Sequence, residues 1–388
     1  GSYFRGELKD RLWQEVLTSY KRLSGEYAPV VMEGAGSISE LNLKDKDIVN
    51  MSMAVATRAA TILVADIERG GVFASVYGSI ELLSPEERAC IKGIIINKFR
   101  GDPALFENGK KQLEELTGIP VVSVLPYFKD IHIEQEDSVA IEHKTGGAVS
   151  GKINVAVVLL RHMSNFTDFN VLERTPGVHL YYAAEPAELK EADIVIIPGS
   201  KNTISDMQYL RRSGMAKAIL QNHQMNGAVY GICGGYQIMG REISDPQRVE
   251  GEMPSIPGLG ILPVRTVLSP EKTTEQCTFS FLDSEKNCRG YEIHMGETYR
   301  EGGETLCSVH GKYEDGCYLN PKTWGTYIHG ILDNSSVINR VLSENNAAEG
   351  PTEFDYEAYK QEQYDKLASL VRQHTDMDCI YRTLKIES

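Results

Sequence analysis

Cys233 stands where a hydrophobic, strand-like segment meets a run of glycines, in Val229-Tyr230-Gly231-Ile232-Cys233-Gly234-Gly235-Tyr236-Gln237. A strand, a sharp turn and a helix form the arrangement that presents a nucleophile above the edge of a sheet. The amino end of the following helix would favour the thiolate, the nucleophilic form of cysteine. A lone cysteine is more often a small buried core residue. The elbow pattern nevertheless predicts that Cys233 is a catalytic nucleophile.

A thiolate nucleophile needs a proton carrier from elsewhere in the chain, because its sequence neighbours cannot reach across the turn. His329 ends the strand-like run Gly325-Thr326-Tyr327-Ile328-His329-Gly330, and a side chain at that point can extend over the edge of a sheet. His294, in Glu292-Ile293-His294-Met295, is a rival. Since a single histidine is commonly structural, the residues alone leave the choice open, and we prefer His329.

The tetrahedral intermediate of acyl transfer also needs hydrogen-bond donors for its oxyanion, usually backbone N–H groups at a tight turn. The apolar run Ile194–Ile197 leads directly into Pro198-Gly199-Ser200-Lys201-Asn202-Thr203. The backbone amides of Gly199, Ser200 and Gly234 are therefore the candidate oxyanion hole. Taken alone, Pro-Gly-Ser is ordinarily just a turn.

Short β-branched runs alternate with helix-like segments throughout the chain, which is typical of an α/β fold with buried parallel strands. In the first part we expect strands at Val30–Met32, Thr61–Val64, Gly93–Ile96 and Val121–Leu125, with helices at Ile48–Ala60 and Ala104–Thr117. In the second part we expect strands at Ile153–Leu160, Val178–Tyr182, Ile194–Ile197 and Ala228–Tyr230, with helices at Ser205–Arg212 and Met215–Met225.

These elements predict two doubly wound domains, at 1–143 and 152–345, joined by a polar, Gly-rich linker at 144–151. A tail from 346 to 388 is rich in charged residues. The spacing of Leu367, Leu370 and Val371 predicts that part of it forms a helix that docks on the second domain.

The composition is that of a globular protein, with 388 residues, 41% of them hydrophobic, and no apolar run of membrane-spanning length. A net charge of −14 without a basic stripe argues against nucleic acid as a partner. Seven cysteines without a C-x-x-C pair are not a disulfide framework, which favours a reducing cytoplasm. Gly1-Ser2 resembles an expression scar, so we expect the natural protein to begin earlier.

Three of these motifs together resemble the glutaminase domain of the cobyrinic and cobyric acid amidotransferases: Gly231–Gln237, Pro198–Thr203 and Tyr327–Gly330. Four further segments resemble the cobyric acid synthase branch of that family: Glu33-Gly34-Ala35-Gly36-Ser37, Val64–Ala74, Ile96–Asp102 and Ser164-Asn165-Phe166-Thr167-Asp168-Phe169. The matches extend from about Val30 to Leu342. The resemblance implies a P-loop domain of the dethiobiotin synthetase type followed by a flavodoxin-like class I glutamine amidotransferase domain.

The activity implied is glutamine- and ATP-dependent amidation of carboxylates of adenosylcobyrinic acid a,c-diamide in cobalamin biosynthesis. ATP would activate a carboxylate as an acyl phosphate with Mg²⁺ beside it, and ammonia from glutamine would displace the phosphate. The resemblance assigns glutamine binding to Gln237, Mg²⁺ to Glu33 and Asp66, and contact with the nucleotide base to Asn97. Strand-end carboxylates can also be ordinary loop residues. Arg69 and Arg100 are candidate corrinoid contacts.

Two departures from the family pattern qualify these expectations. Glutaminases of this type often carry Glu two residues after the histidine, whereas this chain has Ile331, so we expect a Cys-His dyad whose histidine is oriented by another acceptor, with Glu292 as a guess. A G-x-x-x-x-G-K-[ST] phosphate loop is absent from the sequence. We therefore expect an N-terminally truncated synthetase domain that will not sustain ATP-dependent amidation as it stands.

Alternatives remain at this level. The chain could act on another carboxylate, as cobyrinic acid a,c-diamide synthase or a lipid II amidating homologue does. It could also be an α/β binding protein that kept the fold and lost the chemistry. Glutamate release from glutamine separates this last class from the enzymes.

Overall fold

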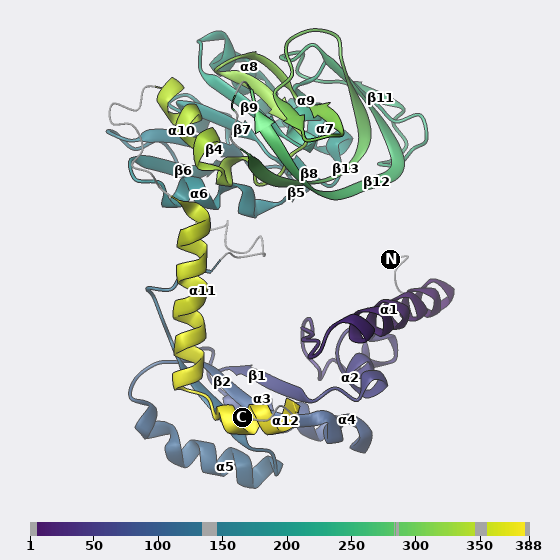
Figure 1. Ribbon diagram of the computed structural model, residues 1–388, viewed down its shortest axis with the longest axis vertical. Coiled ribbons are helices and arrows are strands. Elements are labelled where there is room, and N and C mark those ends of the chain that lie inside the picture. Colours follow the sequence, from purple (N-terminus) through teal and green to yellow (C-terminus); the bar gives the residue numbers. More distant parts are fainter. Residues whose placement is uncertain (1–5, 134–145, 283, 285–286, 346–354, 385–388) are drawn as a thin grey trace. The chain divides into compact units, whose positions relative to one another are not determined.

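The computed structural model describes residues 6–133, 146–282, 284, 287–345 and 355–384. It divides into two compact units, one formed by residues 1–132 and 362–388 and the other by residues 133–361 (Figure 1). Both units mix helices with parallel strands, which confirms the predicted α/β class. Among the described residues, no helix is long and apolar enough to cross a bilayer.

The first unit is built on a parallel sheet of three strands in the order β1-β2-β3. Ile94 and Ile96, which point to the same face of the central strand, are fully buried, whereas Ile95 between them is only partly buried. The strands are β1 (Thr61–Asp66), β2 (Ile91–Phe99) and β3 (Val121–Pro126), and the helices are α1 (Gly6–Glu26), η1 (Lys44–Lys46), α2 (Met51–Thr57), α3 (Val72–Glu81), α4 (Pro85–Cys90), η2 (Pro103–Phe106), α5 (Glu107–Thr117) and α12 (Met377–Leu384).

The strand expected at Val30–Met32 is wrong. This segment pairs with none of the described strands, and the side chain of Val31 is 88% exposed. A β-branched run becomes a strand only when a neighbouring strand takes up its backbone hydrogen bonds, and none is placed beside this one. The other three expected strands of this unit and both expected helices are present, with ends shifted by a few residues.

The second unit has a six-stranded sheet in the order β16-β17-β9-β7-β4-β6. Its five parallel strands therefore follow the flavodoxin-like order 2-1-3-4-5, and ligands bind such sheets at the carboxyl ends of the strands near the point where the order reverses. The elements are β4 (Ile153–Val158), α6 (Asn170–Arg174), β6 (Val178–Ala183), η5 (Pro186–Leu189), β7 (Ile194–Ile197), α7 (Thr203–Ser213), α8 (Met215–Gln224), β9 (Ala228–Ile232), α9 (Gly234–Met239), β16 (Cys317–Asn320), β17 (Thr323–Thr326) and α10 (Ser335–Glu344).

A second sheet in this unit was not foreseen. Its long strands β12 (Val264–Phe281) and β13 (Cys288–Arg300) pair antiparallel, and the rest of the sheet consists of β10 (Glu242–Ser244), β11 (Ser255–Pro257), β14 (Cys307–Val309) and β15 (Tyr313–Asp315). The buried side chains of both sheets form one hydrophobic core. Smaller elements at the sheet edge are β5 (Met163–Ser164), η4 (Phe166–Phe169), β8 (Gly199–Ser200) and η6 (Ile331–Asp333).

The C-terminal tail is helical, as expected, but it does not dock only on the second domain. Helix α11 (Tyr356–Gln373) begins with Tyr356 in the core of the second unit. The residues that follow α11 belong to the first unit, where Asp376 N donates to Val122 O at 2.8 Å and Ser123 Oγ donates to His374 O at 2.8 Å. The apolar spacing predicted the helix and could not predict its partner. Residues 144 and 145 of the expected linker lie outside the described residues.

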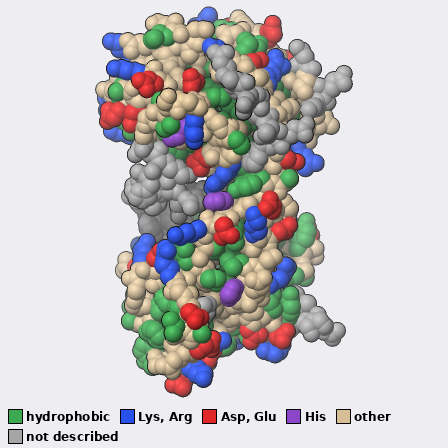
Figure 2. Space-filling model, turned by 90° about the vertical axis from the view of Figure 1, so that its left-hand side faces the viewer, with side chains coloured by type: hydrophobic (Ala, Val, Ile, Leu, Met, Phe, Trp, Pro, Cys, Tyr) green, Lys and Arg blue, Asp and Glu red, His purple; other side chains and the backbone are tan. Residues whose placement is uncertain are grey.

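Charged side chains of both signs are interspersed on the face shown in Figure 2.

Candidate active site

Cys233 lies in the sharp turn between β9 and α9, as the elbow pattern predicted. Its backbone is in the left-handed region, with φ +52° and ψ −110°, which is strained for a residue with a side chain. Its N–H is held by the Thr326 carbonyl at 2.8 Å. A Cβ on Gly235 would overlap the Ile197 carbonyl, and one on Gly234 would lie 2.7 Å from Ser200 N. The glycines are thus required because α9 begins directly against the end of β7.

His329 follows β17 and is completely buried. Its backbone exchanges two hydrogen bonds with Tyr291 of β13, of 2.8 and 3.1 Å, and the two rings stack with centroids 5.2 Å apart. The Cε1 atom of His329 would lie 3.3 Å from a Cβ on Gly199, so the imidazole also borders β8. The structure therefore brings His329 to the strand end predicted for it.

Asp168 on η4 is the acceptor that orients His329. Its Oδ2 lies 2.7 Å from His329 Nδ1, and its Oδ1 accepts the N–H of Gly330 at 2.9 Å. The carboxylate is 2% exposed, and a buried carboxylate needs hydrogen-bond partners within the protein. His329 and Gly330 supply one partner for each oxygen. The guess that Glu292 orients His329 is wrong, because Glu292 Oε2 lies 3.2 Å from His294 Nε2. Sequence reasoning missed Asp168, although it belongs to the segment Ser164–Phe169 singled out for its resemblance.

Burial and the charge of Asp168 act on the pKa of His329 in opposite directions. Burial lowers the pKa of His329, but the negative charge of Asp168, its hydrogen bond and the adjacent Cys233 side chain together raise that pKa to about 10. The imidazolium is the form that accompanies a thiolate and that can protonate a leaving amine.

The thiol of Cys233 is directed at the backbone of β13. Its Sγ lies 3.6 Å from the Ile293 carbonyl oxygen, within the range of a weak S–H donor. His329 Nε2 is buried, and among the described residues it has no hydrogen-bond partner of ordinary geometry. The Cys233 side chain is close enough to contribute to the raised pKa of His329.

His294 is occupied by structural contacts. Its Nδ1 lies 3.2 Å from Gly296 O and its Nε2 lies 3.2 Å from Glu292, while its ring stacks on Tyr327 with centroids 3.8 Å apart. Both ring nitrogens of His294 already have partners, and its ring packs on Tyr327. These contacts indicate a structural role for His294.

The three candidate oxyanion donors lie together, but the alternation of the β5–β8 ladder directs the N–H of Gly199 toward Ser164, which leaves the N–H groups of Ser200 and Gly234 as the better candidates. Gly199 and Ser200 form β8, which pairs with β5, and Ser200 N is the atom closest to a Cβ built on Gly234. The end of β7 and the start of α9 therefore meet at the turn that holds Cys233.

Gln237, one helical turn after Cys233, is 3% exposed, and its amide is fully hydrogen-bonded. Its Oε1 accepts from Thr203 Oγ1 at 2.9 Å, and its Nε2 lies 3.1 Å from both Met295 O and Tyr327 Oη. These bonds link α9 to α7, β13 and the segment before His329. Direct contact with glutamine stays a prediction for this residue, and it would require the network to open.

The carboxyl ends of β1 and β2 carry the candidates of the first unit. Asp66 and Asn97 face each other in register. Lys98 Nζ lies 2.8 Å from Asp66, and this hydrogen bond, with one from Glu68 N, lowers the pKa of the Asp66 carboxyl. Asn97 Oδ1 accepts the N–H of Lys98 at 2.9 Å. Among the described residues, no three His, Cys, Asp or Glu side chains are grouped to hold a metal ion.

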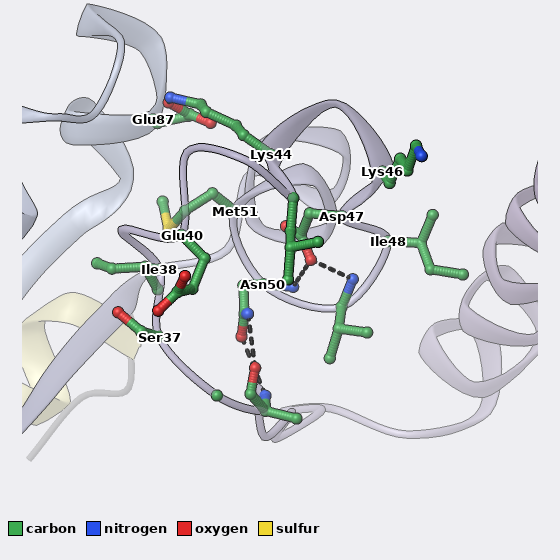
Figure 3. Close-up of a pocket in the computed structure, with 14 residues that line it drawn as sticks. Ser37, Ile38, Glu40, Lys44, Lys46, Asp47, Ile48, Asn50, Met51 and Glu87 are labelled. Carbon is green, nitrogen blue, oxygen red and sulfur yellow. Dashed lines mark hydrogen bonds and ion pairs between the residues drawn. The ribbon is translucent and has the colours of Figure 1, made fainter. Parts of the chain in front are cut away.

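Glu33 is exposed and precedes a loop that borders a pocket of about 190 Å³ (Figure 3). Asn50 holds this loop, since its Oδ1 accepts from Ala35 N at 3.0 Å and its Nδ2 donates to Ala35 O at 2.8 Å. Lys44 and Glu87, paired at 2.6 Å, also line the pocket. Glu33 thus directly precedes a loop whose backbone is held in place by Asn50.

Comparisons with known proteins agree with both units. A CobB/CobQ-like glutamine amidotransferase domain matches residues 154–337, and an AAA domain matches residues 7–135. The chain is similar to the cobyric acid synthase of Bacteroides fragilis strain YCH46, with 56% identity over 386 residues that cover 98% of this chain and 78% of the relative. It is also similar to those of Parabacteroides distasonis (54% identity, covering 97% and 77%) and Salmonella typhi (44% identity, covering 98% and 78%).

The alignments extend along nearly all of this chain and along more than three quarters of each relative. The chain therefore belongs to the cobyric acid synthase family, the glutamine amidotransferases of cobalamin biosynthesis.

Proposed function

We propose that the second unit hydrolyses glutamine with a Cys233–His329–Asp168 triad, and that the ammonia released amidates a corrinoid carboxylate activated in the first unit. The observation that carries the proposal is the double contact of the buried Asp168 carboxylate with His329 Nδ1 and Gly330 N. That contact fixes Nδ1 as the protonated nitrogen and leaves Nε2 for the thiol, the relation between histidine and nucleophile in a hydrolytic triad.

The first half of the reaction begins from the thiolate–imidazolium pair that the raised pKa of His329 favours, once Cys233 Sγ turns from the Ile293 carbonyl toward His329 Nε2. The thiolate attacks the side-chain amide carbon of glutamine, forming a C–S bond and moving the carbonyl electrons onto oxygen. The N–H groups of Ser200 and Gly234 stabilise this oxyanion. The intermediate collapses as the C–N bond breaks, and His329 donates its proton to the leaving nitrogen, which departs as ammonia.

In the second half, water attacks the thioester carbon while His329 Nε2 accepts one of its protons. The second tetrahedral intermediate collapses with cleavage of the C–S bond, which releases glutamate and regenerates the thiolate of Cys233 beside the imidazolium of His329. Asp168 stabilises the imidazolium in both halves without itself taking the proton. Because His329 is already held in one orientation by Asp168 and Tyr291, these steps need no rotation of the imidazole.

In the first unit, Glu33 and Asp66 are the residues that would hold Mg²⁺, and Asn97 is the one that would contact the nucleotide base. Exposed carboxylate oxygens, at the end of β1 for Asp66 and before the pocket-lining loop for Glu33, suit this ion, which is usually held by one or two carboxylates together with phosphates and water. When bound, Mg²⁺ would supply positive charge to the phosphates of ATP during carboxylate activation. We further propose adenosylcobyrinic acid a,c-diamide as the carboxylate substrate, with Arg69 and Arg100 as contacts for its anionic groups.

Labelling with an electrophilic glutamine analogue, followed by peptide mass mapping, tests the nucleophile. The expected adduct lies on Cys233 and on none of the other six cysteines, of which Cys277, Cys288, Cys307 and Cys317 are also buried and lack the elbow. Substituting Cys233→Ala should abolish the label, whereas Cys90→Ala should not affect it. An adduct on another cysteine would overturn the assignment.

A further inference from the structure

Asp206 is a buried carboxylate that the mechanism above does not use. It lies in the first turn of α7, is fully buried, and follows the turn that leads out of β8. A carboxylate is expensive to remove from water unless its oxygens are hydrogen-bonded. The partners that Asp206 has acquired therefore indicate its role.

The side-chain partners of Asp206 lie in β8 or directly before β5, the two strands of a small ribbon. Ser200 Oγ donates to Asp206 Oδ2 at 2.6 Å. The backbone N–H of His162, directly before β5, approaches the two carboxylate oxygens at 3.2 and 3.3 Å, and His162 Nδ1 lies 3.0 Å from Oδ1. Asp206 thus binds both strands of the ribbon.

The register of that ribbon indicates where the Ser200 amide faces. Ser200 is opposite Met163, while the next residue, Lys201, donates its N–H to His162 O at 2.8 Å. In an antiparallel pair only alternate residues bond across the ladder, so the N–H of Ser200 is directed away from β5. Its nitrogen lies beside Gly234, at the turn that holds Cys233.

We propose that Asp206 is a positioning residue for glutamine hydrolysis, which fixes the Ser200 peptide through the Ser200 hydroxyl so that its N–H faces the developing oxyanion. This inference rests on the proposed glutaminase function and extends it by one residue that touches neither glutamine nor Cys233. The hydroxyl is held from two sides, because Ser200 Oγ also accepts the N–H of Asn202 at 3.0 Å. Both bonds restrain the Ser200 side chain and with it the position of the adjoining backbone.

The test is a double-mutant cycle between Asp206→Asn and Ser200→Ala, measured as glutamate release by the complete enzyme. Asp206→Asn should lower kcat by roughly tenfold to a hundredfold, less than the 10²–10³ that loss of an oxyanion donor costs, and should change KM by less than about twofold. In the Ser200→Ala background the same substitution should have a clearly smaller effect, because the link it acts through is already absent.

Asp193→Asn is the matched control. Asp193 accepts the N–H of Asn154 at 2.8 Å next to the opposite end of β7, and its loss should leave kcat unchanged. Additive effects in the cycle, or a rise in KM with unchanged kcat, would overturn the inference. Wild-type kcat in Asp206→Asn would do so as well, provided that Cys233→Ala is inactive with glutamine. If Cys233→Ala still hydrolyses glutamine, the proposed glutaminase function itself fails.

Discussion

The two sites of this chain place their carboxylates in opposite environments. In the second unit, Asp168 is 2% exposed and each of its oxygens bonds the histidine segment. In the first unit, the side chain of Asp66 is 37% exposed. Its partner is the long side chain of Lys98, which is itself 45% exposed. A buried, fully bonded carboxylate fixes geometry before any substrate arrives, whereas an exposed one can exchange its partner for an incoming ion.

The comparison teaches that the glutaminase centre is assembled by folding, while the strand ends of the first unit remain available for ligands. If that is correct, substitutions in each unit should impair one half-reaction and spare the other. The predictions below test this separation.

Cys233→Ala should have the largest effect. Without the thiolate no thioester can form, so glutamine-dependent amidation should fall below detection in the complete enzyme. Amidation with free ammonia should stay close to normal, because it bypasses the second unit. Both rates can be measured on the same corrinoid substrate. Retained use of glutamine would show that the elbow is not the nucleophilic site.

His329→Asn should follow. Loss of the proton carrier removes general acid–base catalysis, worth roughly 10²–10⁴ in rate, and glutamate release should fall by that factor. The control is His294→Asn, since His294 contacts Glu292 and Gly296 rather than the thiol. That variant should be much milder. Equal losses in the two variants would contradict the assignment of His329.

Asp168→Asn should reduce kcat for glutamine by roughly 10³. The corresponding substitution in a serine triad, which leaves the histidine in the wrong tautomer, costs about 10⁴. We expect a smaller loss here because a thiol is intrinsically the better nucleophile. The physical reason is that an amide can donate to Nδ1 and thereby stabilise the wrong tautomer. Glu292→Gln should not reproduce this loss. Its doing so would return Glu292 to the role that the structure gives to Asp168.

Glu33→Gln tests the first unit. If Glu33 holds Mg²⁺, the variant should lower amidation by about a hundredfold with either nitrogen source, which corresponds to about 2.7 kcal/mol of transition-state stabilisation. Glutamate release should be nearly unchanged. The dependence of amidation on Mg²⁺ concentration is the direct measurement, and an unaltered dependence would refute the assignment.

The last prediction concerns stability. The pKa of His329 is raised from 6.5 to about 10 in the folded state, so its protonation stabilises the fold fully below pH 6.5, and this contribution is lost as the pH rises through about 10. Asp168→Asn removes the main cause of that increase. The difference in Tm between wild type and variant should therefore be greatest near pH 6 and shrink toward pH 10. A difference that grows with pH would contradict the charge-based account.

Much of the architecture could be predicted from the chain alone, because its signals are local. The buried parallel strands are short β-branched runs, and the expected Ile194–Ile197 agrees with β7 residue for residue. The elbow could also be predicted from the sequence, because Gly234 and Gly235 directly follow Cys233. The backbone contacts that require these glycines are confined to the same turn. By contrast, Val30–Met32 has the composition of a strand and no neighbour to pair with. The long hairpin of β12 and β13 was missed, although buried and exposed residues alternate along parts of β12.

The sequence by itself indicated the candidate nucleophile, the α/β class and the family resemblance, because each of these depends on residues adjacent in the chain. Only the tertiary structure decided which groups act on that nucleophile. Asp168 is 161 positions before His329, and no spacing rule connects them. The same holds for Asp206 and His162, and for the Ile293 carbonyl beside the thiol. Such contacts are set by which strands pack at one sheet edge, and that depends on the whole core rather than on any local pattern.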